Sequence, residues 1–298
     1  MRSAIASLLL IVALAPARAQ DPAANGPNLV RTETLSITVG GKKTSVEVHL
    51  PAGPSFARPV VFVVPGWAAG PGNFESLADH FASLGFAAAL YKEPDNWSND
   101  TAKWSGHIHD AIDALTAAGG DPRSSVFGEL DMSKLSLLGH SFGGAAVVVE
   151  AASDPRVKSV VAFAPVNQAH RDLLLQSASK LDVPLLVVAG SGDWLATNKT
   201  YTQPIYDQAT NAPDREYIEI KGGGHNLYQD GEKGSKDHAI ALSYATAWLE
   251  RFLQGKADAG GYTDGTHGEA DRNAGLLSQA KHAAKLVVET AGLTSRLP

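Results

Sequence analysis

Ser141 stands at a point where the sequence changes from a strand pattern to a helix pattern. Residues 135–138 are apolar and predict a buried strand, and the small residues of 145–152 predict a helix packed close to it. Gly139 and Gly143 flank this bend, where the backbone needs a shape that glycine tolerates. A Gly-x-Ser-x-Gly pattern at a strand-to-helix bend predicts a nucleophilic serine hydroxyl.

A serine hydroxyl needs a base to accept its proton. Asp193 follows the buried apolar run 185–189, and His225 lies on a glycine-rich loop between the strand pattern 217–220 and the helix pattern 239–253. The chain order Ser, Asp, His at these places predicts a catalytic triad. In it His225 acts first as base and then as acid, while Asp193 holds the imidazole in the useful tautomer.

Other residues remain alternatives for these two roles. Asp207 and Asp214 could replace Asp193, although neither follows a buried strand so directly. The histidines that compete with His225, without its strand–loop–helix context, are His107, His109, His170 and His238. The first two of these stand two positions apart and point to different faces of a helix, so we expect no metal site there. We expect no cofactor either.

A serine hydrolase also needs two donors for the oxyanion that forms during attack. The N–H of Phe142, directly after the serine, should be one donor. The N–H of Trp67, which follows the apolar run 60–64 and a Pro-Gly pair, should be the other. The Trp67 indole, His140 and Trp194 are expected to contact the substrate.

Short apolar runs alternate with helical patterns along the chain, which predicts an α/β fold with a mostly parallel, doubly wound sheet. The runs are 60–64, 87–91, 135–138, 157–163 and 185–189. Two alternating stretches, 34–39 and 44–50, predict antiparallel N-terminal strands. The further helical patterns are 73–84, capped by Asn73, and 104–118.

Between the strand patterns 157–163 and 185–189 there is room for only one short helix. We therefore expect no large lid, and an open cleft walled by Trp67 and Trp194. Trp97 and Trp104 are further candidates for its walls.

The motifs PGW, GHSFGG, GSGDW and GGGH occur in this order. The set resembles the dienelactone-hydrolase-like and cutinase- or polyester-hydrolase-like branch of the α/β-hydrolase superfamily, over about residues 30–255. The resemblance implies an α/β-hydrolase fold, a triad of Ser141, Asp193 and His225, and oxyanion donors at Trp67 and Phe142. The chain departs from that branch in two ways. It has no cysteine for the disulfide that many members carry, and Phe142 replaces their usual Met or Gln.

The two ends of the chain differ from its middle. Residues 1–19 carry a positive start, an apolar stretch and a small-x-small cleavage pattern, which predicts a signal peptide and a secreted or periplasmic protein. Residues 20–28 predict a linker and 29–256 the catalytic domain. Residues 257–298 predict a glycine-rich linker and a C-terminal amphipathic helix, with an apolar stripe at Leu276, Ala280, Ala283, Val287 and Ala291.

The formal net charge of −6 is mild, and charges of both signs are interspersed, so we expect no nucleic-acid partner and no membrane partner after signal removal. The sequence thus predicts a secreted serine hydrolase of carboxylic esters, polyesters included, that works through an acyl-enzyme as a monomer or homodimer. A secreted amidase or polyamide hydrolase, acting for example on polyaspartate, is the enzymatic alternative. A non-catalytic binding protein on the same scaffold is the other alternative.

Overall fold

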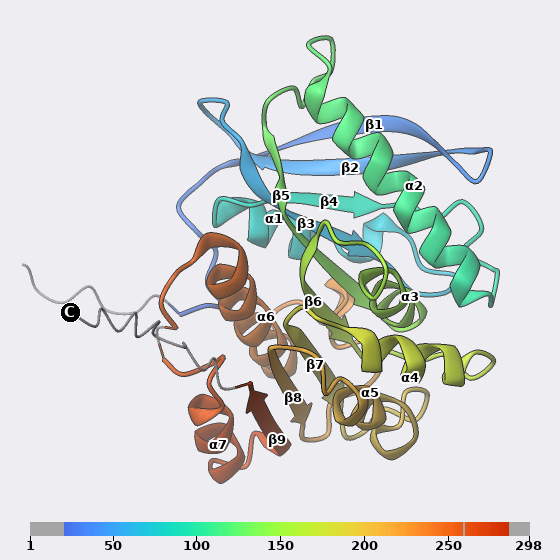
Figure 1. Ribbon diagram of the computed structural model, residues 1–298. Coiled ribbons are helices and arrows are strands. Elements are labelled where there is room, and N and C mark those ends of the chain that lie inside the picture. The colour runs from blue at the N-terminus through green and yellow to red at the C-terminus, as the bar shows by residue number, and fades with distance from the viewer. Residues whose placement is uncertain (1–20, 259, 286–298) are drawn as a thin grey trace, which may run out of the picture.

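A nine-stranded sheet crosses the molecule, with helices on both of its faces (Figure 1). The computed structural model describes residues 21–258 and 260–285. The predicted signal peptide lies outside the described residues. The described part of the predicted linker is held against helix α1 (Glu75–Ser83), where the Gly26 N–H donates to Ser83 Oγ at 2.8 Å.

The strand order is β1-β2-β4-β3-β5-β6-β7-β8-β9. The strands are β1 Val30–Val39, β2 Lys42–Pro51, β3 Arg58–Val64, β4 Ala87–Tyr91, β5 Leu130–His140, β6 Val157–Phe163, β7 Leu185–Gly190, β8 Asp214–Ile220 and β9 Leu277–Ala284. Strands β3 to β8 pair in parallel, while β1, β2 and β9 pair antiparallel with their neighbours. The predicted α/β class, with a mostly parallel sheet and antiparallel N-terminal strands, is confirmed.

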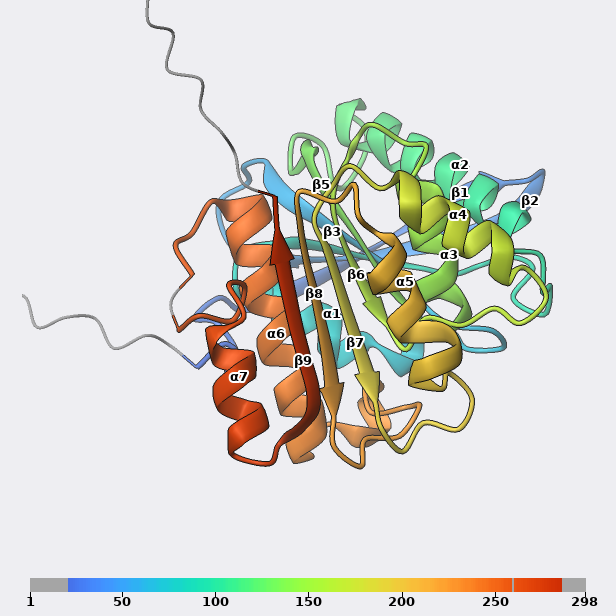
Figure 2. The same ribbon diagram turned by 60° about the horizontal axis from the view of Figure 1, so that its bottom comes forward.

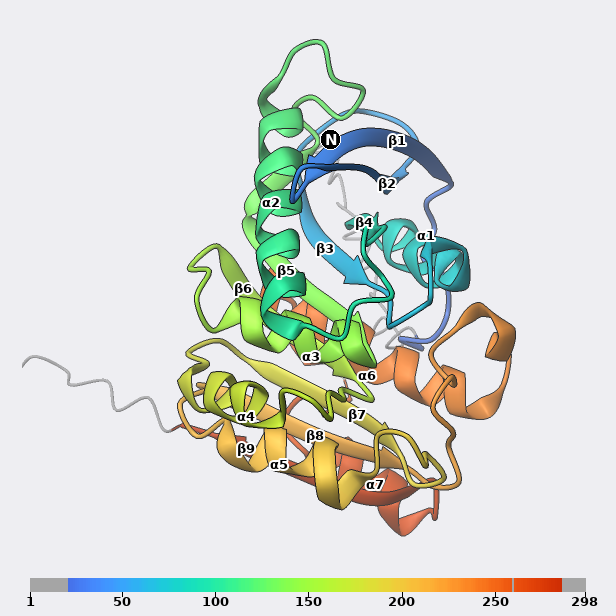
Figure 3. The same ribbon diagram turned by 90° about the vertical axis from the view of Figure 1, so that its right-hand side faces the viewer.

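Two layers of helices enclose this sheet. The remaining helices are α2 Thr101–Gly120, α3 Phe142–Ala151, α4 Arg171–Lys180, α5 Gln203–Gln208, α6 Lys236–Gln254 and α7 Thr266–Asn273. Helices α2 to α5 cover one face, and α1 and α6 cover the other (Figures 2 and 3). Within the described ranges, no helix has the length and apolar character needed to cross a bilayer.

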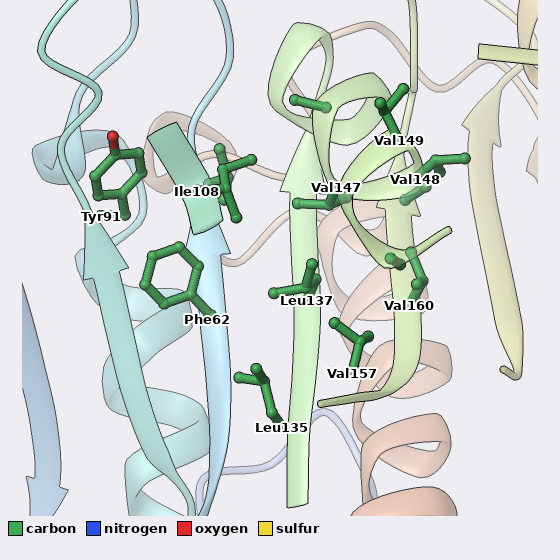
Figure 4. Packing of buried hydrophobic residues seen from close by; sticks show 14 of the residues in the cluster. Phe62, Tyr91, Ile108, Leu135, Leu137, Val147, Val148, Val149, Val157 and Val160 are labelled. Atoms are coloured by element: carbon green, nitrogen blue, oxygen red, sulfur yellow. The ribbon is translucent and has the colours of Figure 1, made fainter. Parts of the chain in front are cut away.

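The core lies on both faces of the sheet. Phe62 and Leu137 pack with α2 and α3 on one side (Figure 4), and Val63 and Leu138 pack with α1 and α6 on the other. Burial on both faces explains why these strands are continuous apolar runs rather than alternating ones. Because helices cover both faces of the sheet, a ligand can reach the sheet at the loops that follow its strands.

The start of α1 differs from its prediction. The helix is preceded by Phe74 as its N-cap, and Asn73 belongs to the 3₁₀ turn Pro71–Asn73. The Asn73 side chain accepts a hydrogen bond from the Gly70 N–H at 3.2 Å. Asn73 therefore caps this preceding turn, which lies one step upstream of the predicted helix start.

The predicted C-terminal helix is wrong over the described residues. Residues Leu277–Ala284 form β9, which pairs antiparallel with β8, and α7 lies within the segment predicted as linker. A free sheet edge offers a ladder of backbone hydrogen bonds, and the buried Leu277 extends the core there. Val287 and Ala291 of the predicted stripe lie outside the described residues.

Candidate active site

Ser141 lies directly after β5 and directly before α3, so the bend predicted from the sequence is present. Its backbone has φ 57° and ψ −121°, which is unusual for a residue with a side chain. A Cβ on Gly143 would lie 2.3 Å from the Pro65 carbonyl oxygen. Glycine at this position therefore lets α3 begin against the end of β3.

The structure brings Ser141, His225 and Asp193 together from the ends of β5, β8 and β7. His225 Nε2 lies 2.8 Å from Ser141 Oγ, and His225 Nδ1 lies 2.7 Å from Asp193 Oδ2. With the ring proton on Nδ1, the imidazole donates to the carboxylate and accepts the serine hydroxyl proton. This is the arrangement that a triad requires.

Asp193 is almost fully buried, with a side-chain exposure of 1%. Burial alone would raise its pKa, but hydrogen bonds from His225 and from the Ala196 and Leu195 N–H groups keep that pKa below its ordinary value. The two N–H groups donate to Oδ1 and leave Oδ2 for the imidazole. Asp193 is thus an ionised and fixed partner for His225.

The two predicted oxyanion donors lie beside the nucleophile. Phe142 is the first residue of α3, and Trp67 follows β3 in the next loop. Among the backbone hydrogen bonds of the described turns, loops and caps, neither N–H is a donor. Both residues line the same cavity as Ser141. Their N–H groups therefore remain the predicted donors for an oxyanion.

A cavity of about 630 Å³ opens beside Ser141 and His225. Its other lining residues include Gly66, Ala69, Val166, Asn167, Leu195 and Gln229. Among the described residues that line it, none is Asp, Glu, Lys or Arg. An apolar cavity with a few amide groups suits a neutral, largely apolar ligand.

His140 contacts the loop that carries His225. This contact was not expected from the sequence. Its Nε2–H donates to the His225 carbonyl oxygen at 2.9 Å, and its ring centroid lies 4.9 Å from that of His225. Burial, together with the charge that His225 can carry, lowers the pKa of His140 to about 3. His140 is thus a neutral ring that lines the cavity and holds the His225 backbone.

Of the other two residues predicted to contact the substrate, one lines the cavity and one does not. Trp67 lines the cavity, half exposed, and packs edge-to-face with Trp97 at a centroid distance of 4.8 Å. Trp194 is 78% exposed and does not line the cavity, so its prediction as a wall is wrong, and the neighbouring Leu195 takes that place. Trp104 is buried in the core against the Phe142 ring.

The alternatives for acid and base have other partners. Asp214 pairs with His282 at 2.8 Å, and Asp207 lies on α5. His238 donates from Nδ1 to the Leu227 carbonyl oxygen at 2.9 Å. The remaining histidines considered for the base contact acidic side chains at other places: His107, His109 and His170.

Comparison with known families gives a match that covers most of the described chain. The model of the family described as PET hydrolase-like matches residues 12–275. The chain belongs to the PET hydrolase-like family. The resemblance to polyester hydrolases noted in the sequence is thereby confirmed, and the family is one of carboxylic ester hydrolases.

Curated relatives of this PET hydrolase-like chain include a bis(hydroxyethyl) terephthalate hydrolase and cutinases. A "Bis(hydroxyethyl) terephthalate hydrolase" of Streptomyces coelicolor is 28% identical over 242 residues, which are 80% of this chain and 72% of that protein. "Cutinase cut1" of Thermobifida fusca is 24% identical over 84% of this chain and 78% of its own length. "Cutinase est2" of Thermobifida alba is 24% identical over 65% of this chain and 59% of its own length.

Proposed function

We propose that this protein is an exported serine hydrolase that cleaves carboxylic esters through a covalent acyl-enzyme. Ser141 is the nucleophile, His225 the base and acid, and Asp193 the residue that orients and stabilises His225. The observation that carries the proposal is the continuous hydrogen-bonded chain from Ser141 Oγ through the imidazole to the Asp193 carboxylate, at 2.8 and 2.7 Å. Its reacting end borders the cavity.

The geometry supports a two-step reaction. Ser141 Oγ attacks the ester carbonyl carbon while His225 Nε2 accepts the hydroxyl proton. The N–H groups of Phe142 and Trp67 stabilise the resulting oxyanion. His225 then gives the proton to the departing alcohol, which leaves the acyl group on Ser141. Water then attacks the acyl-enzyme in the same way, with His225 as the base again, and the carboxylic acid is released.

The cavity favours neutral esters with apolar or aromatic acyl groups. Its lining has no formally charged Asp, Glu, Lys or Arg among the described residues, and the Trp67 indole stands at its edge. This composition disfavours polyaspartate, since a polyanion would find no cation to pair with there. The names of the curated relatives, a bis(hydroxyethyl) terephthalate hydrolase and cutinases, support an aromatic or aliphatic polyester as the substrate class.

The first test measures hydrolysis of p-nitrophenyl acetate and butyrate by the wild type, Ser141→Ala and Ser36→Ala, in which an exposed serine on β1 is replaced. We expect turnover to fall by at least 10³-fold in Ser141→Ala, because the nucleophile is lost. Ser36→Ala should match the wild type. A fluorophosphonate probe should label Ser141 in the wild type and in Ser36→Ala, and should not label Ser141→Ala. Equal turnover in all three proteins would defeat the proposal, and so would no turnover in any of them; the latter result would favour a binding protein.

The second test separates ester from amide cleavage. Matched ester and anilide substrates with the same acyl group should give a higher kcat/KM for the ester. Bis(hydroxyethyl) terephthalate, an aliphatic polyester film and polyaspartate complete the panel, and we expect turnover of the first two only. A higher kcat/KM for the anilide would favour the amidase alternative.

Export is part of the proposal and has its own test. The pattern in residues 1–19 supports cleavage after Ala19. Protein recovered from the periplasm or the medium of an expressing bacterium should begin at Gln20 when its N-terminus is sequenced. An uncleaved chain retained in the cytoplasm would contradict this part.

A further inference from the structure

A second group of polar side chains converges at the other end of α3 from the nucleophile. His109 comes from α2, Glu150 from the last turn of α3, and Asp154 from the turn that follows it. We call these three residues the His109 cluster. Each offers one ligand atom, and the three atoms lie within 4.8 Å of one another.

The distances between the ligand atoms of the His109 cluster are similar to those between the ligand atoms around one bound metal ion. His109 Nδ1 lies 2.9 Å from Glu150 Oε1 and 3.4 Å from Asp154 Oδ2. Ligand atoms placed about 2.0–2.2 Å from one tetrahedral zinc ion stand roughly 3.3 Å apart. A small divalent ion could therefore contact all three atoms after modest side-chain movement.

Residues around the cluster hold its ligands in place. Ser105 Oγ donates to the second oxygen of Glu150 at 2.6 Å. Arg156 Nε donates to Asp154 Oδ1 at 2.9 Å. His109 Nε2 lies 3.9 Å from Asp113 Oδ2, so the ring nitrogen that faces away from the cluster has a carboxylate near it. Partners of this kind commonly surround histidine and carboxylate ligands of metals.

The two carboxylate side chains of the cluster are buried, and its histidine faces solvent. The side chains of Glu150 and Asp154 are 3% and 1% exposed, whereas His109 is half exposed and leaves a path from solvent. Two buried carboxylates beside one imidazole thus form a ligand set that is open on one side.

We propose that the His109 cluster binds a divalent transition-metal ion, with zinc as the fitting species. One imidazole nitrogen and two carboxylate oxygens are ligands that zinc accepts, and the exposed side leaves the fourth position to water. The ion replaces the proton on His109 Nδ1, and the ring keeps its other proton on Nε2, toward Asp113. The sequence argument against His107 and His109 as a ligand pair still stands, because the partners of His109 come from α3 and the turn after it.

The Arg156 guanidinium now pairs with the cluster, and it has to move when a metal ion binds. Its Nη2 donates to Asp154 Oδ2 at 2.6 Å and lies 3.4 Å from His109 Nδ1. The Asp154 Oδ1 and Asp113 contacts of Arg156 lie outside the triangle of ligand atoms. Arg156 Nε also donates to Asp154 Oδ2, at 3.0 Å. When the ion binds, Arg156 gives up both hydrogen bonds to this ligand oxygen and keeps those to Asp154 Oδ1 and Asp113. Zinc bound there would tie α2 to the C-terminal end of α3.

The test is a calorimetric titration of the mature, tag-free protein with ZnCl₂ in chelator-free buffer at pH 7.5, together with thermal unfolding. We expect one ion per chain, a Kd in the micromolar range, and a rise in Tm of about 5 °C at saturating zinc. His109→Gln keeps an N–H donor for Glu150 but cannot supply the imidazole ligand. Its Kd should be at least tenfold weaker and its Tm rise should be lost.

His170→Gln is the matched control, because His170 is also a partly exposed histidine near a carboxylate, that of Asp100, which precedes α2. Its zinc affinity and Tm rise should equal those of the wild type. Glu150→Gln, if it folds, should behave like His109→Gln. The proposal is overturned if the wild type binds no zinc at 1 mM, or if His109→Gln binds zinc as tightly as the wild type. Either result would leave the cluster as an ion-pair network around Arg156.

Discussion

Ser141 holds its hydroxyl in place by an unfavourable backbone. A non-glycine residue at φ 57° and ψ −121° costs on the order of 1–3 kcal/mol, and the surroundings must stabilise it. They do so through the Ser141 N–H, which donates to the Phe163 carbonyl oxygen at 2.8 Å, and through its own carbonyl oxygen, which accepts from Ala145 and Val166. The strand, the helix and the next loop thus share in fixing one side chain.

Under the proposed mechanism, His140 affects the reaction through its hydrogen bond to the His225 carbonyl oxygen. His140→Phe keeps a flat ring of similar size and removes the N–H that donates to the His225 carbonyl oxygen. We expect kcat for p-nitrophenyl butyrate to fall about tenfold, because the imidazole loses part of its orientation. KM should change by less than a factor of two. A stopped assay of kcat and KM, with circular dichroism to verify folding, checks this.

Trp194→Phe is the comparison variant, since Trp194 is exposed and does not line the cavity. It should keep the wild-type kcat. If His140→Phe also keeps the wild-type kcat, His140 contributes packing only and does not position His225.

The positions of the triad residues could be predicted from the sequence, because each follows a strand pattern that can be read locally. The role of His140 could not, because its partner His225 lies 85 positions away. The position of the Trp194 side chain, outside the cavity, could not be predicted for a related reason. The side chain after an acid at a strand end can point either way, and local sequence does not decide which.

At the scale of elements, the loops after β7 and β8 touch backbone to backbone. A Cβ on Gly190 would lie 2.2 Å from the Gly223 carbonyl oxygen. That oxygen also accepts the Gly192 N–H at 2.9 Å. The absence of a side chain at Gly190 therefore lets the loop that carries Asp193 lie directly against the loop that carries His225.

Gly190→Ala should push these loops apart. We expect kcat/KM to fall by about 10²-fold, because a shift of about 1 Å in catalytic groups has that effect. The free energy of unfolding should fall by about 1–3 kcal/mol from overpacking. Ester turnover and urea unfolding measure the two effects.

Gly224→Ala is its matched control, because a Cβ there meets no heavy atom within 4 Å and lies on the same loop as His225. It should retain the wild-type stability and most of its activity. Comparable losses in both variants would mean that the loop tolerates no side chain, whatever its contacts.

The element that the sequence misassigned shows where local patterns fail. Residues 277–284 carry alanines at spacings compatible with a helix, yet they form β9 because β8 offers an unpaired edge. Ala280 lies beside Gly268 of α7, where an added Cβ would come within 3.0 Å. This packing depends on a strand and a helix that local periodicity cannot foresee.

At the scale of the whole molecule, the C-terminal part covers a buried acid. Glu216 on β8 is 1% exposed, and in the described residues neither of its carboxylate oxygens has a hydrogen-bond partner. Burial raises its pKa to about 9, helped by Asp214, Asp258 and Asp264 and opposed by Arg251. The native state therefore keeps Glu216 protonated at neutral pH.

Stability should depend on pH accordingly. Between about pH 5 and pH 9 the native protein binds a proton at Glu216 that the unfolded chain has released. The free energy of unfolding due to this group therefore falls as pH rises, by about 1 kcal/mol per pH unit, and levels off above pH 9. Glu216→Gln removes this loss, so it should be more stable than the wild type at pH 8 by about 2–3 kcal/mol and similar to it at pH 5.

Urea unfolding at pH 5, 6.5 and 8 measures this difference. Glu269→Gln, which removes one exposed carboxylate from α7, should follow the wild type at every pH. If Glu216→Gln has a constant offset from the wild type at all three values, Glu216 is ionised in the native state and finds a partner by rearrangement.

The absence of a large insertion between β6 and β7 also affects the whole molecule. Only α4 lies between these strands, so no lid domain covers the cavity in the described residues. We expect the rate on a soluble short-chain ester to rise smoothly across its solubility limit, and bulky or polymeric esters to be accepted. A sharp increase in rate where droplets form would indicate a moving cover and would contradict this expectation.

The bond from His225 to Ser141 joins positions 84 residues apart, and the bond from His225 to Asp193 joins positions 32 apart. Such distant contacts form late in folding, because long loops must close before they can be made. Helices return early after dilution from denaturant, so helical circular dichroism should recover before ester turnover does. Under the proposed mechanism, ester turnover begins only when β8 and the loop that carries His225 have joined the sheet. Under the proposed export, a chain that leaves the cytoplasm unfolded would therefore cleave no ester before it leaves.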